Sequence, residues 1–147
     1  MSVARHGAIR PRRLYVDTSA YLSILLGEDG SDELARQSQD AELLSSVLMV
    51  LEATRNLVRL ARDGSLKPDQ YKACVERLAI DIQGYVLRDL TLDLCRSNLM
   101  PAATTPRSLD LVHLRTALSF HAEEPLDRFL TSDAALHQAA RELGLPV

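Results

Sequence analysis

The chain has 147 residues, of which 46% are hydrophobic and 25% are charged, and its formal net charge at pH 7 is −3. These values predict one globular domain with a continuous core, and they argue against a second full domain and against an unspecific binder of polyanions. The longest apolar runs fall far short of the ~20 residues that span a bilayer, so we expect a cytoplasmic protein without membrane contact. Cys74 and Cys95 show neither metal-ligand spacing nor the density of a disulfide framework, and we expect reduced thiols.

Predicted strands and helices alternate along the chain. In the first half we expect a strand at 12–17, helices at 19–26 and 31–39, a weak strand at 41–45, and helices at 46–63 and 67–82. In the second half we expect a strand at 84–90, a short helix at 91–100, a helix within 105–122, a strand at 128–131, a helix from 132 and a last short strand at 145–147. Gly27 is expected to end the first helix, and Ser31 and Ser108 are expected to be N-caps. This alternation predicts an α/β fold with a mostly parallel sheet and helices on both of its faces.

Three aspartates are expected to meet at the edge formed by the carboxyl ends of the strands, where parallel sheets bind ligands. Asp17 ends the first predicted strand, Asp133 follows the strand at 128–131, and Asp110 lies in the first turn of the helix that Ser108 caps. Taken singly, each has an alternative role as a helix cap or as a partner of the helix dipole. Two carboxylates ~4 Å apart repel by roughly 4 kcal/mol at an effective dielectric constant of about 20, so a cluster of them would need a cation.

Glu52 is a fourth candidate, on the helix at 46–63. A helical wheel gathers the apolar residues of this helix on one side and puts Glu52 opposite them, beside Arg55 and Arg59. One interpretation is a solvated glutamate three residues before an arginine. The other is a helix face that borders an open cleft. There Glu52 would bind a metal, and Arg55, Arg59 and Arg62 would contact a polyanion substrate.

The segments "LYVDTSAYL", "SSVLMVLEATRNLVRL", "RSLDLVHLRTAL" and "FLTSDAAL" occur in an order and at separations that resemble a PIN-domain nuclease, most closely the VapC-type toxins of toxin–antitoxin pairs. The resemblance covers residues 14–147 and implies a three-layer fold with a sheet of about five strands. It assigns the family's four acidic residues to Asp17, Glu52, Asp110 and Asp133. In the family these residues bind one or two Mg2+ or Mn2+ ions and cleave RNA, so the resemblance makes all four catalytic and metal-binding residues here.

The resemblance also implies partners. It implies a structured RNA substrate such as tRNA or rRNA, a homodimer, and a VapB-like antitoxin whose extended tail directs a basic residue at the acids. A non-catalytic PIN-like module that binds RNA or protein is the alternative function. A phosphotransfer domain fits less well, because it commonly requires a second acid where this chain has Ser19.

The remaining polar residues near the four acids are expected to support them. Ser19 and Thr131 are interpreted as caps or as hydrogen-bond donors to the carboxylates, since no histidine base accompanies them in a recognised order. His113 follows Asp110 by three residues, and a histidine packed against the helix is favoured over a catalytic base. Residues 1–13 form a basic extension with arginines and no acid, for which a disordered arm that touches RNA and an upstream start without function both remain open.

Overall fold

The computed structural model describes residues 9–96, 103–104 and 107–147, and within them a sheet of four parallel strands lies between helices. The strands are β1 (Arg13–Val16), β2 (Glu42–Ser46), β3 (Tyr85–Arg88) and β4 (Arg128–Leu130), in the order β3-β2-β1-β4. The helices are α1 (Thr18–Leu26), α2 (Ser31–Ser38), α3 (Leu48–Arg62), α4 (Pro68–Asp81), α5 (Ser108–Glu123) and α6 (Ala134–Glu142), with short 3-10 turns η1 (Ile82–Gly84) and η2 (Asp93–Cys95). The predicted α/β class and parallel sheet are confirmed.

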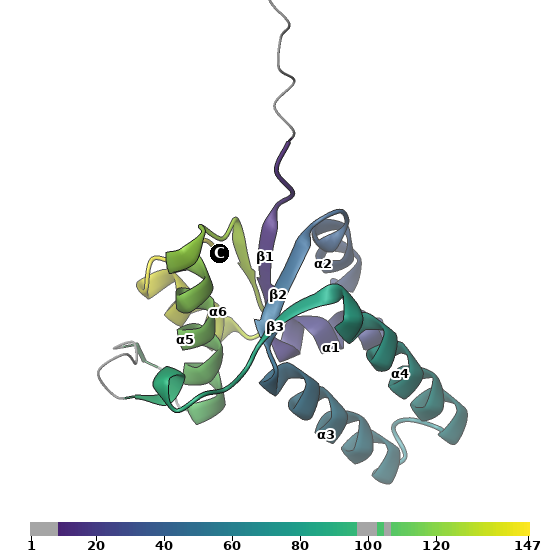
Figure 1. The fold of residues 1–147 in the computed structure, drawn as a ribbon. Coiled ribbons are helices and arrows are strands. Elements are labelled where there is room, and N and C mark those ends of the chain that lie inside the picture. The colour runs from purple at the N-terminus through teal and green to yellow at the C-terminus, as the bar shows by residue number, and fades with distance from the viewer. Residues whose placement is uncertain (1–8, 97–102, 105–106) are drawn as a thin grey trace, which may run out of the picture.

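The central strand β1 is buried on both faces, and its side chains alternate between two apolar cores. Tyr15 packs with residues of α5, β4 and α6, whereas Leu14 and Val16 pack with residues of α1, α3 and α4. Helices α5 and α6 therefore cover one side of the sheet, and the other four helices lie on the opposite side (Figure 1). This arrangement gives the three layers expected of a PIN-like fold.

The sheet has four strands where the sequence predicted about five. The strand expected at 145–147 does not form, although the N–H of Phe129 donates to the carbonyl oxygen of Pro146 at 2.6 Å. Pro146 has no N–H of its own, so it cannot return a hydrogen bond and continue the ladder. The helix expected at 91–100 is reduced to η2, and residues 97–100 lie outside the described part of the chain.

Two predicted N-caps are wrong by one residue. Helices α2 and α5 begin at Ser31 and Ser108 themselves, and the cap positions belong to Gly30 and Arg107. Gly30 has φ of 84°, a left-handed conformation that glycine adopts without steric cost, and this turn lets the helix start at the next residue. Gly27 ends α1 in the same left-handed region, with φ of 64°, as predicted.

The amino end of β1 is fixed by ion pairs. Arg13 is buried and contacts Glu42 at 2.9 Å, its backbone N–H donates to Asp127 at 2.7 Å, and Arg10 contacts the same aspartate at 3.2 Å. The chain therefore enters the sheet at the amino ends of the strands, opposite to the carboxyl edge where β1 ends (Figure 1). The predicted disordered arm falls mostly on residues 1–8, which lie outside the described residues. Among the residues that the structure describes, no helix is both long and apolar enough to cross a bilayer.

Candidate functional site

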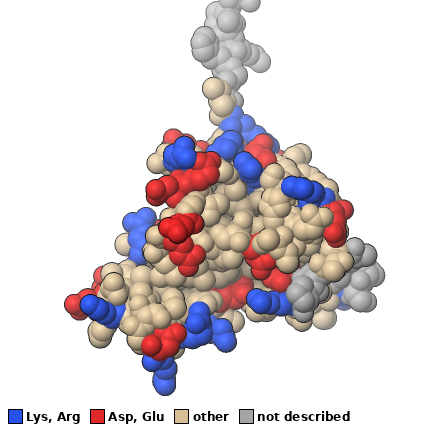
Figure 2. Space-filling model, turned by 180° about the vertical axis from the view of Figure 1, so that it is seen from behind, with Lys and Arg blue, Asp and Glu red and all other residues tan. Residues whose placement is uncertain are grey.

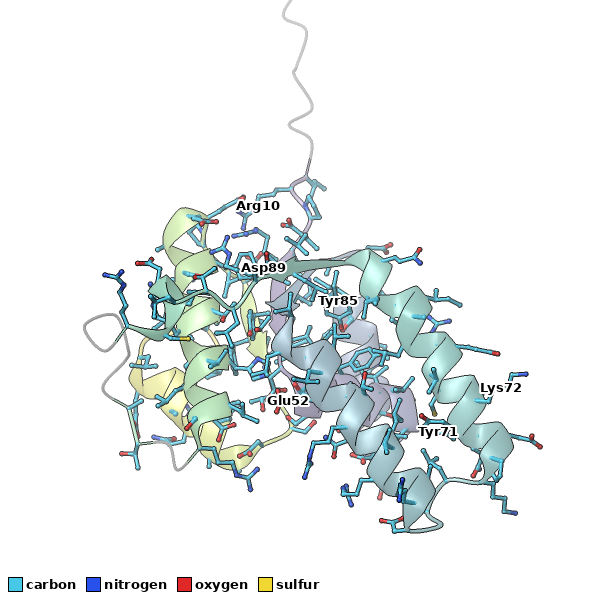
Figure 3. The ribbon with its side chains drawn as sticks, turned by 60° about the horizontal axis from the view of Figure 1, so that its bottom comes forward. Arg10, Glu52, Tyr71, Lys72, Tyr85 and Asp89 are labelled. Carbon is cyan, nitrogen blue, oxygen red and sulfur yellow. The ribbon has the colours of Figure 1, made fainter. Side chains whose placement is uncertain are left out.

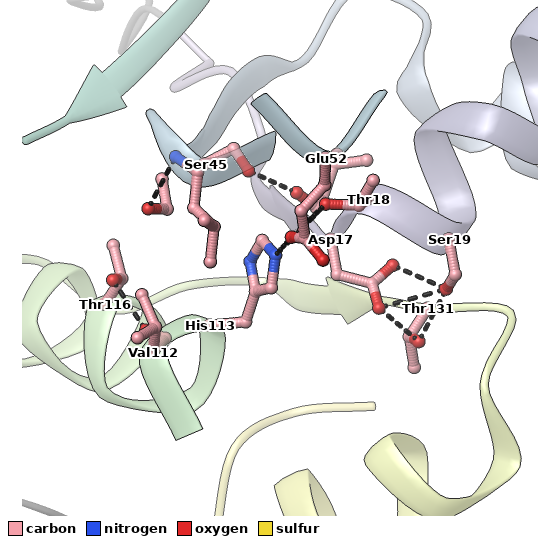
Figure 4. Close-up of polar contacts among 12 residues, drawn as sticks. Asp17, Thr18, Ser19, Ser45, Glu52, Val112, His113, Thr116 and Thr131 are labelled. Carbon is pink, nitrogen blue, oxygen red and sulfur yellow. Dashed lines mark hydrogen bonds and ion pairs between the residues drawn. The ribbon is translucent and has the colours of Figure 1, made fainter. Parts of the chain in front are cut away.

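Asp17 stands where β1 ends and α1 begins. Its backbone N–H still donates to the carbonyl oxygen of Leu130 at 3.1 Å, while its side chain caps α1 by accepting from the N–H of Ala20 at 2.9 Å. The hydroxyl of Ser19 donates to the same carboxylate at 2.8 Å and that of Thr131 at 2.7 Å (Figure 4). Asp17 is 3% exposed, so its position is determined by these donors rather than by solvent. Ser19 and Thr131 thus act on Asp17 as the sequence predicted.

The pKa of Asp17 is raised above its ordinary value because burial disfavours the charged form. Hydrogen bonds from Thr131, Ala20 and Ser19 and the charge of His113 oppose this effect without cancelling it. A buried carboxylate in this condition would be stabilised in its charged form by a cation beside it.

Glu52 lies at the border of the buried face of α3, not opposite to it. The buried stripe of this helix runs through Met49, Ala53 and Leu57, at spacings of four residues. The helical wheel instead predicts an apolar side that is centred away from this stripe, and it therefore places Glu52 in solvent. The interpretation as a solvated glutamate is therefore wrong, and Glu52 is on the side of α3 that faces α5 (Figure 3).

The carboxylate of Glu52 is held by two donors. Thr18 donates to its Oε1 at 2.7 Å, and Nε2 of His113 contacts the same oxygen at 2.8 Å (Figure 4). Burial alone would raise the pKa of Glu52, but the hydrogen bonds from His113 and Thr18 and the charge of His113 outweigh it, and the pKa is lowered. Glu52 is thus kept ionised close to Asp17, which directly precedes Thr18 in the chain.

His113 is the residue whose importance the sequence understated. It is 2% exposed, as expected for a packed histidine, but its ring contacts Glu52, Thr18 and the hydroxyl of Tyr15. The signal was its position three residues after Asp110, which puts both on one helix face. Tyr15 and Thr18 carried no comparable signal of a contact with this histidine.

Asp133 is the N-cap of α6. Its Oδ1 accepts from the N–H groups of Ala135 at 2.9 Å and Leu136 at 3.1 Å, so the alternative role as a cap holds for this residue. Its own N–H donates at 3.0 Å to Thr131, whose hydroxyl donates in turn to Asp17. Asp133 is therefore tied to Asp17 through one shared hydroxyl group.

Asp110 lies in the first turn of α5 and is half-buried. A negative charge at this position is stabilised by the helix dipole and in turn stabilises the start of α5. It shares the helix face of His113, whose ring contacts Glu52.

The three arginines of α3 are exposed. Arg59 contacts Asp63 at 3.6 Å and donates to Asn56 at 3.3 Å, and Asn56 donates to the backbone oxygen of Glu52 at 2.9 Å. The arginines thus follow the helix outward from Glu52, and their charges remain accessible to a polyanion.

The donor set suits a hard divalent cation. Carboxylates surrounded by hydroxyl groups offer oxygen ligands, which Mg2+ prefers, and both described cysteines are free thiols. Over the described ranges, no three acidic, histidine or cysteine side chains are already arranged to hold one ion together. Because Mg2+ keeps several of its waters and needs only one or two carboxylates, Asp17 and Glu52 fit such an ion.

The four-stranded parallel sheet, the helices on both faces and the acids at its carboxyl edge define a PIN-like α/β domain. Ribonuclease VapC35 of Mycobacterium tuberculosis, from strains CDC 1551 / Oshkosh and ATCC 25618 / H37Rv, is 31% identical over 141 residues, which cover 91% of this chain and 94% of that protein. Ribonuclease VapC47 of strain CDC 1551 / Oshkosh is 29% identical over 136 residues, covering 89% of this chain and 92% of its own. A scan against protein-family models gave no match. The chain belongs to the VapC family, and the resemblance inferred from its four motifs is confirmed.

Proposed function

We propose that this protein is a divalent-metal-dependent endoribonuclease and the growth-inhibiting toxin of a toxin–antitoxin pair. The observation that carries the proposal is the grouping of Asp17 and Glu52 around Thr18 and His113 at the carboxyl edge of the sheet. Relatives named as ribonucleases, aligned over nine tenths of the chain, support RNA as the substrate class. We further propose a structured RNA, such as tRNA or rRNA, as the target.

Asp17, Glu52, Asp110 and Asp133 would hold Mg2+ or Mn2+. When bound, such an ion supplies polarisation of the scissile phosphate and a lowered pKa for a bound water molecule. The protein's own contribution is to present ionised oxygens in fixed orientations. Thr131 and Ser19 orient the carboxylate of Asp17, and His113 keeps that of Glu52 charged.

Two partners follow from the proposal. A small VapB-like antitoxin is proposed to cover the acidic edge, and a second copy of the chain is proposed to complete a homodimer.

The test is cleavage of total cellular RNA by the purified protein with Mg2+, with Mn2+ and with excess EDTA. We expect cleavage only with metal, and none by Asp17→Asn or Asp110→Asn, because asparagine keeps the side-chain shape and removes the charge. Asp32→Asn is the matched control, since Asp32 is an exposed acid in the first turn of α2 and should retain full activity.

Cleavage in EDTA, or undiminished cleavage by Asp17→Asn, contradicts the proposal. RNA binding without cleavage under every metal condition would instead identify the non-catalytic module.

A further inference from the structure

A chain of hydrogen bonds runs from the apolar core to the candidate site. The hydroxyl of Tyr15, which is completely buried, contacts Nδ1 of His113 at 2.8 Å. Nε2 of the same ring contacts Oε1 of Glu52 at 2.8 Å (Figure 4). The ring of Tyr15 is itself held in place, because it stacks on Phe129 with an interplanar angle of 5° and a centroid distance of 5.3 Å. The chain therefore starts from a side chain with a fixed orientation.

The proton on the Glu52 side of His113 can be assigned. At 2.8 Å, Nε2 and an ionised carboxylate oxygen form a hydrogen bond only if Nε2 carries the proton. The hydroxyl of Thr18 does not supply this proton, since it already donates to the same oxygen at 2.7 Å. Nε2 of His113 is therefore a donor to Glu52.

The other ring nitrogen, Nδ1, contacts the hydroxyl of Tyr15 at 2.8 Å. Two further hydroxyl groups lie near Tyr15, but Ser45 donates to the backbone oxygen of Val16 at 2.6 Å and Thr116 donates to that of Val112 at 2.7 Å. The hydroxyl of Tyr15 is therefore left as the partner of Nδ1. Burial raises the pKa of Tyr15 above its ordinary value, so the hydroxyl keeps its proton.

We propose that Tyr15 is a positioning residue, which holds the ring of His113 against Glu52 and thereby orients the carboxylate of Glu52 for catalysis. The catalytic part of this inference rests on the proposed function, whereas the orientation of the ring does not. Tyr15 touches neither solvent nor substrate, so it acts on the site only through the histidine.

The first test is the tautomer of His113 in the metal-free protein, measured from the imidazole nitrogens by long-range ¹H–¹⁵N NMR, with the resonances assigned by comparison with His113→Gln. We expect a proton on Nε2 in the wild type and a changed Nδ1 resonance in Tyr15→Phe, which keeps the ring and removes one hydroxyl group. A ring without a proton on Nε2 overturns the proposal, as does an unchanged Nδ1 resonance in Tyr15→Phe. This measurement needs no RNA cleavage, so it separates failure of the inference from failure of the proposed function.

The second test is kinetic. Tyr15→Phe should lower kcat about 10-fold to 100-fold, the usual effect of removing a group that orients a metal ligand, while KM for RNA stays unchanged. The matched control is Tyr21→Phe, which removes a hydroxyl that donates to Asp81 at 3.0 Å, outside this chain of hydrogen bonds. Thermal unfolding of both variants measures any general loss of stability.

A double-mutant cycle distinguishes positioning from packing. In His113→Gln an amide N–H can reach Glu52 and there is no ring nitrogen for Tyr15 to hold, so adding Tyr15→Phe should cost no further activity. Equal losses from Tyr15→Phe in the wild-type and His113→Gln backgrounds would mean that Tyr15 serves packing alone, and would overturn the proposal.

Discussion

Asp17 and Glu52 are neighbouring carboxylates whose pKa values are shifted in opposite directions. Asp17 is nearly completely buried and makes no ion pair with another described residue, whereas Glu52 is partly exposed and contacts His113. The difference comes from their surroundings, since both residues have ordinary pKa values of about 4. The candidate site therefore contains two different carboxylates. The charged form of Asp17 would be stabilised by a cation, whereas Glu52 is already charged.

These shifts predict opposite effects of pH on the stability of the metal-free protein. The native state binds the proton of Asp17 more tightly than the unfolded state does, because the pKa of Asp17 is raised in the native state. The stability that this residue contributes is therefore complete below its ordinary pKa of about 4. It is lost as the pH rises through the raised native pKa. Glu52 contributes stability above its ordinary pKa, and this is lost as the pH falls through the lowered native value. Urea unfolding in EDTA over a pH series should therefore show Asp17→Asn gaining on the wild type as the pH rises. Glu52→Gln should approach the wild type as the pH falls, and pH profiles parallel to the wild type for both variants would contradict the shifts.

The single hydroxyl group of Thr131 is predicted to support RNA cleavage through two acids of the candidate site, Asp17 and Asp133. Thr131→Val keeps the side-chain volume but removes the donor to Asp17 and the acceptor for the N–H of Asp133. We expect cleavage to fall about 10-fold to 100-fold, as for other groups that orient metal ligands. Thr54→Val is the matched control, because the exposed hydroxyl of Thr54 donates only to a backbone oxygen of its own helix in the described structure. Equal rates for the two variants would remove Thr131 from the site.

At the scale of elements, α3 carries an acid at its inner edge and arginines along its exposed face. Arg55→Ala with Arg59→Ala should leave the helix intact, since alanine has the highest helix propensity. The double variant should raise KM for RNA and lower the slope of log affinity against log salt by about 1 to 2, because two phosphate contacts are lost. Binding is measured in an Asp17→Asn background, which prevents cleavage.

The control for this prediction removes two arginines at the opposite edge of the sheet. Arg36 on α2 and Arg128 at the start of β4 are both exposed, so Arg36→Ala with Arg128→Ala changes the net charge equally. If both double variants change the salt slope alike, the arginines of α3 act only through overall charge, and their predicted contact with substrate is wrong.

The order of the elements could be predicted from the sequence because it depends on local patterns. Gly27 ended its helix as expected, since only its own backbone angle is involved. The position of Glu52 could not be predicted in this way, because α3 has apolar residues around much of its surface and packing against α1 and α4 selects the stripe of Met49, Ala53 and Leu57. The partner of His113 likewise depends on a contact across 61 residues, for which a single sequence gives no signal.

At the scale of the whole molecule, the distribution of charge favours binding of a cation at the four acids before binding of RNA. The net charge is −3, and setting aside the four acids of the site leaves +1 for the rest of the chain. On the face seen in Figure 2, acidic and basic side chains are interspersed over the described surface. RNA binding should therefore depend on neutralisation of the acidic edge, with modest affinity from the exposed arginines.

The same argument predicts how an antitoxin would inhibit. We expect a short open reading frame next to this gene, whose product has a DNA-binding domain and a basic tail and restores growth when this protein is expressed. A guanidinium group in the tail can form two hydrogen bonds with a carboxylate and supply positive charge directly beside Asp17. Tail and metal would then compete for one site, so Mn2+ should restore cleavage by the purified complex in a concentration-dependent way.

The decisive comparison uses a tail variant in which the basic residue is replaced by alanine. If the guanidinium occupies the acidic edge, this variant should inhibit more weakly, and less Mn2+ should be needed to restore cleavage. The variant should still bind through the rest of its tail, which a pull-down of the complex verifies. If inhibition is equal at every Mn2+ concentration and equal without the basic residue, the tail does not replace the metal at Asp17. It would then act by covering the edge and excluding RNA, because a steric block needs neither charge nor competition with the ion.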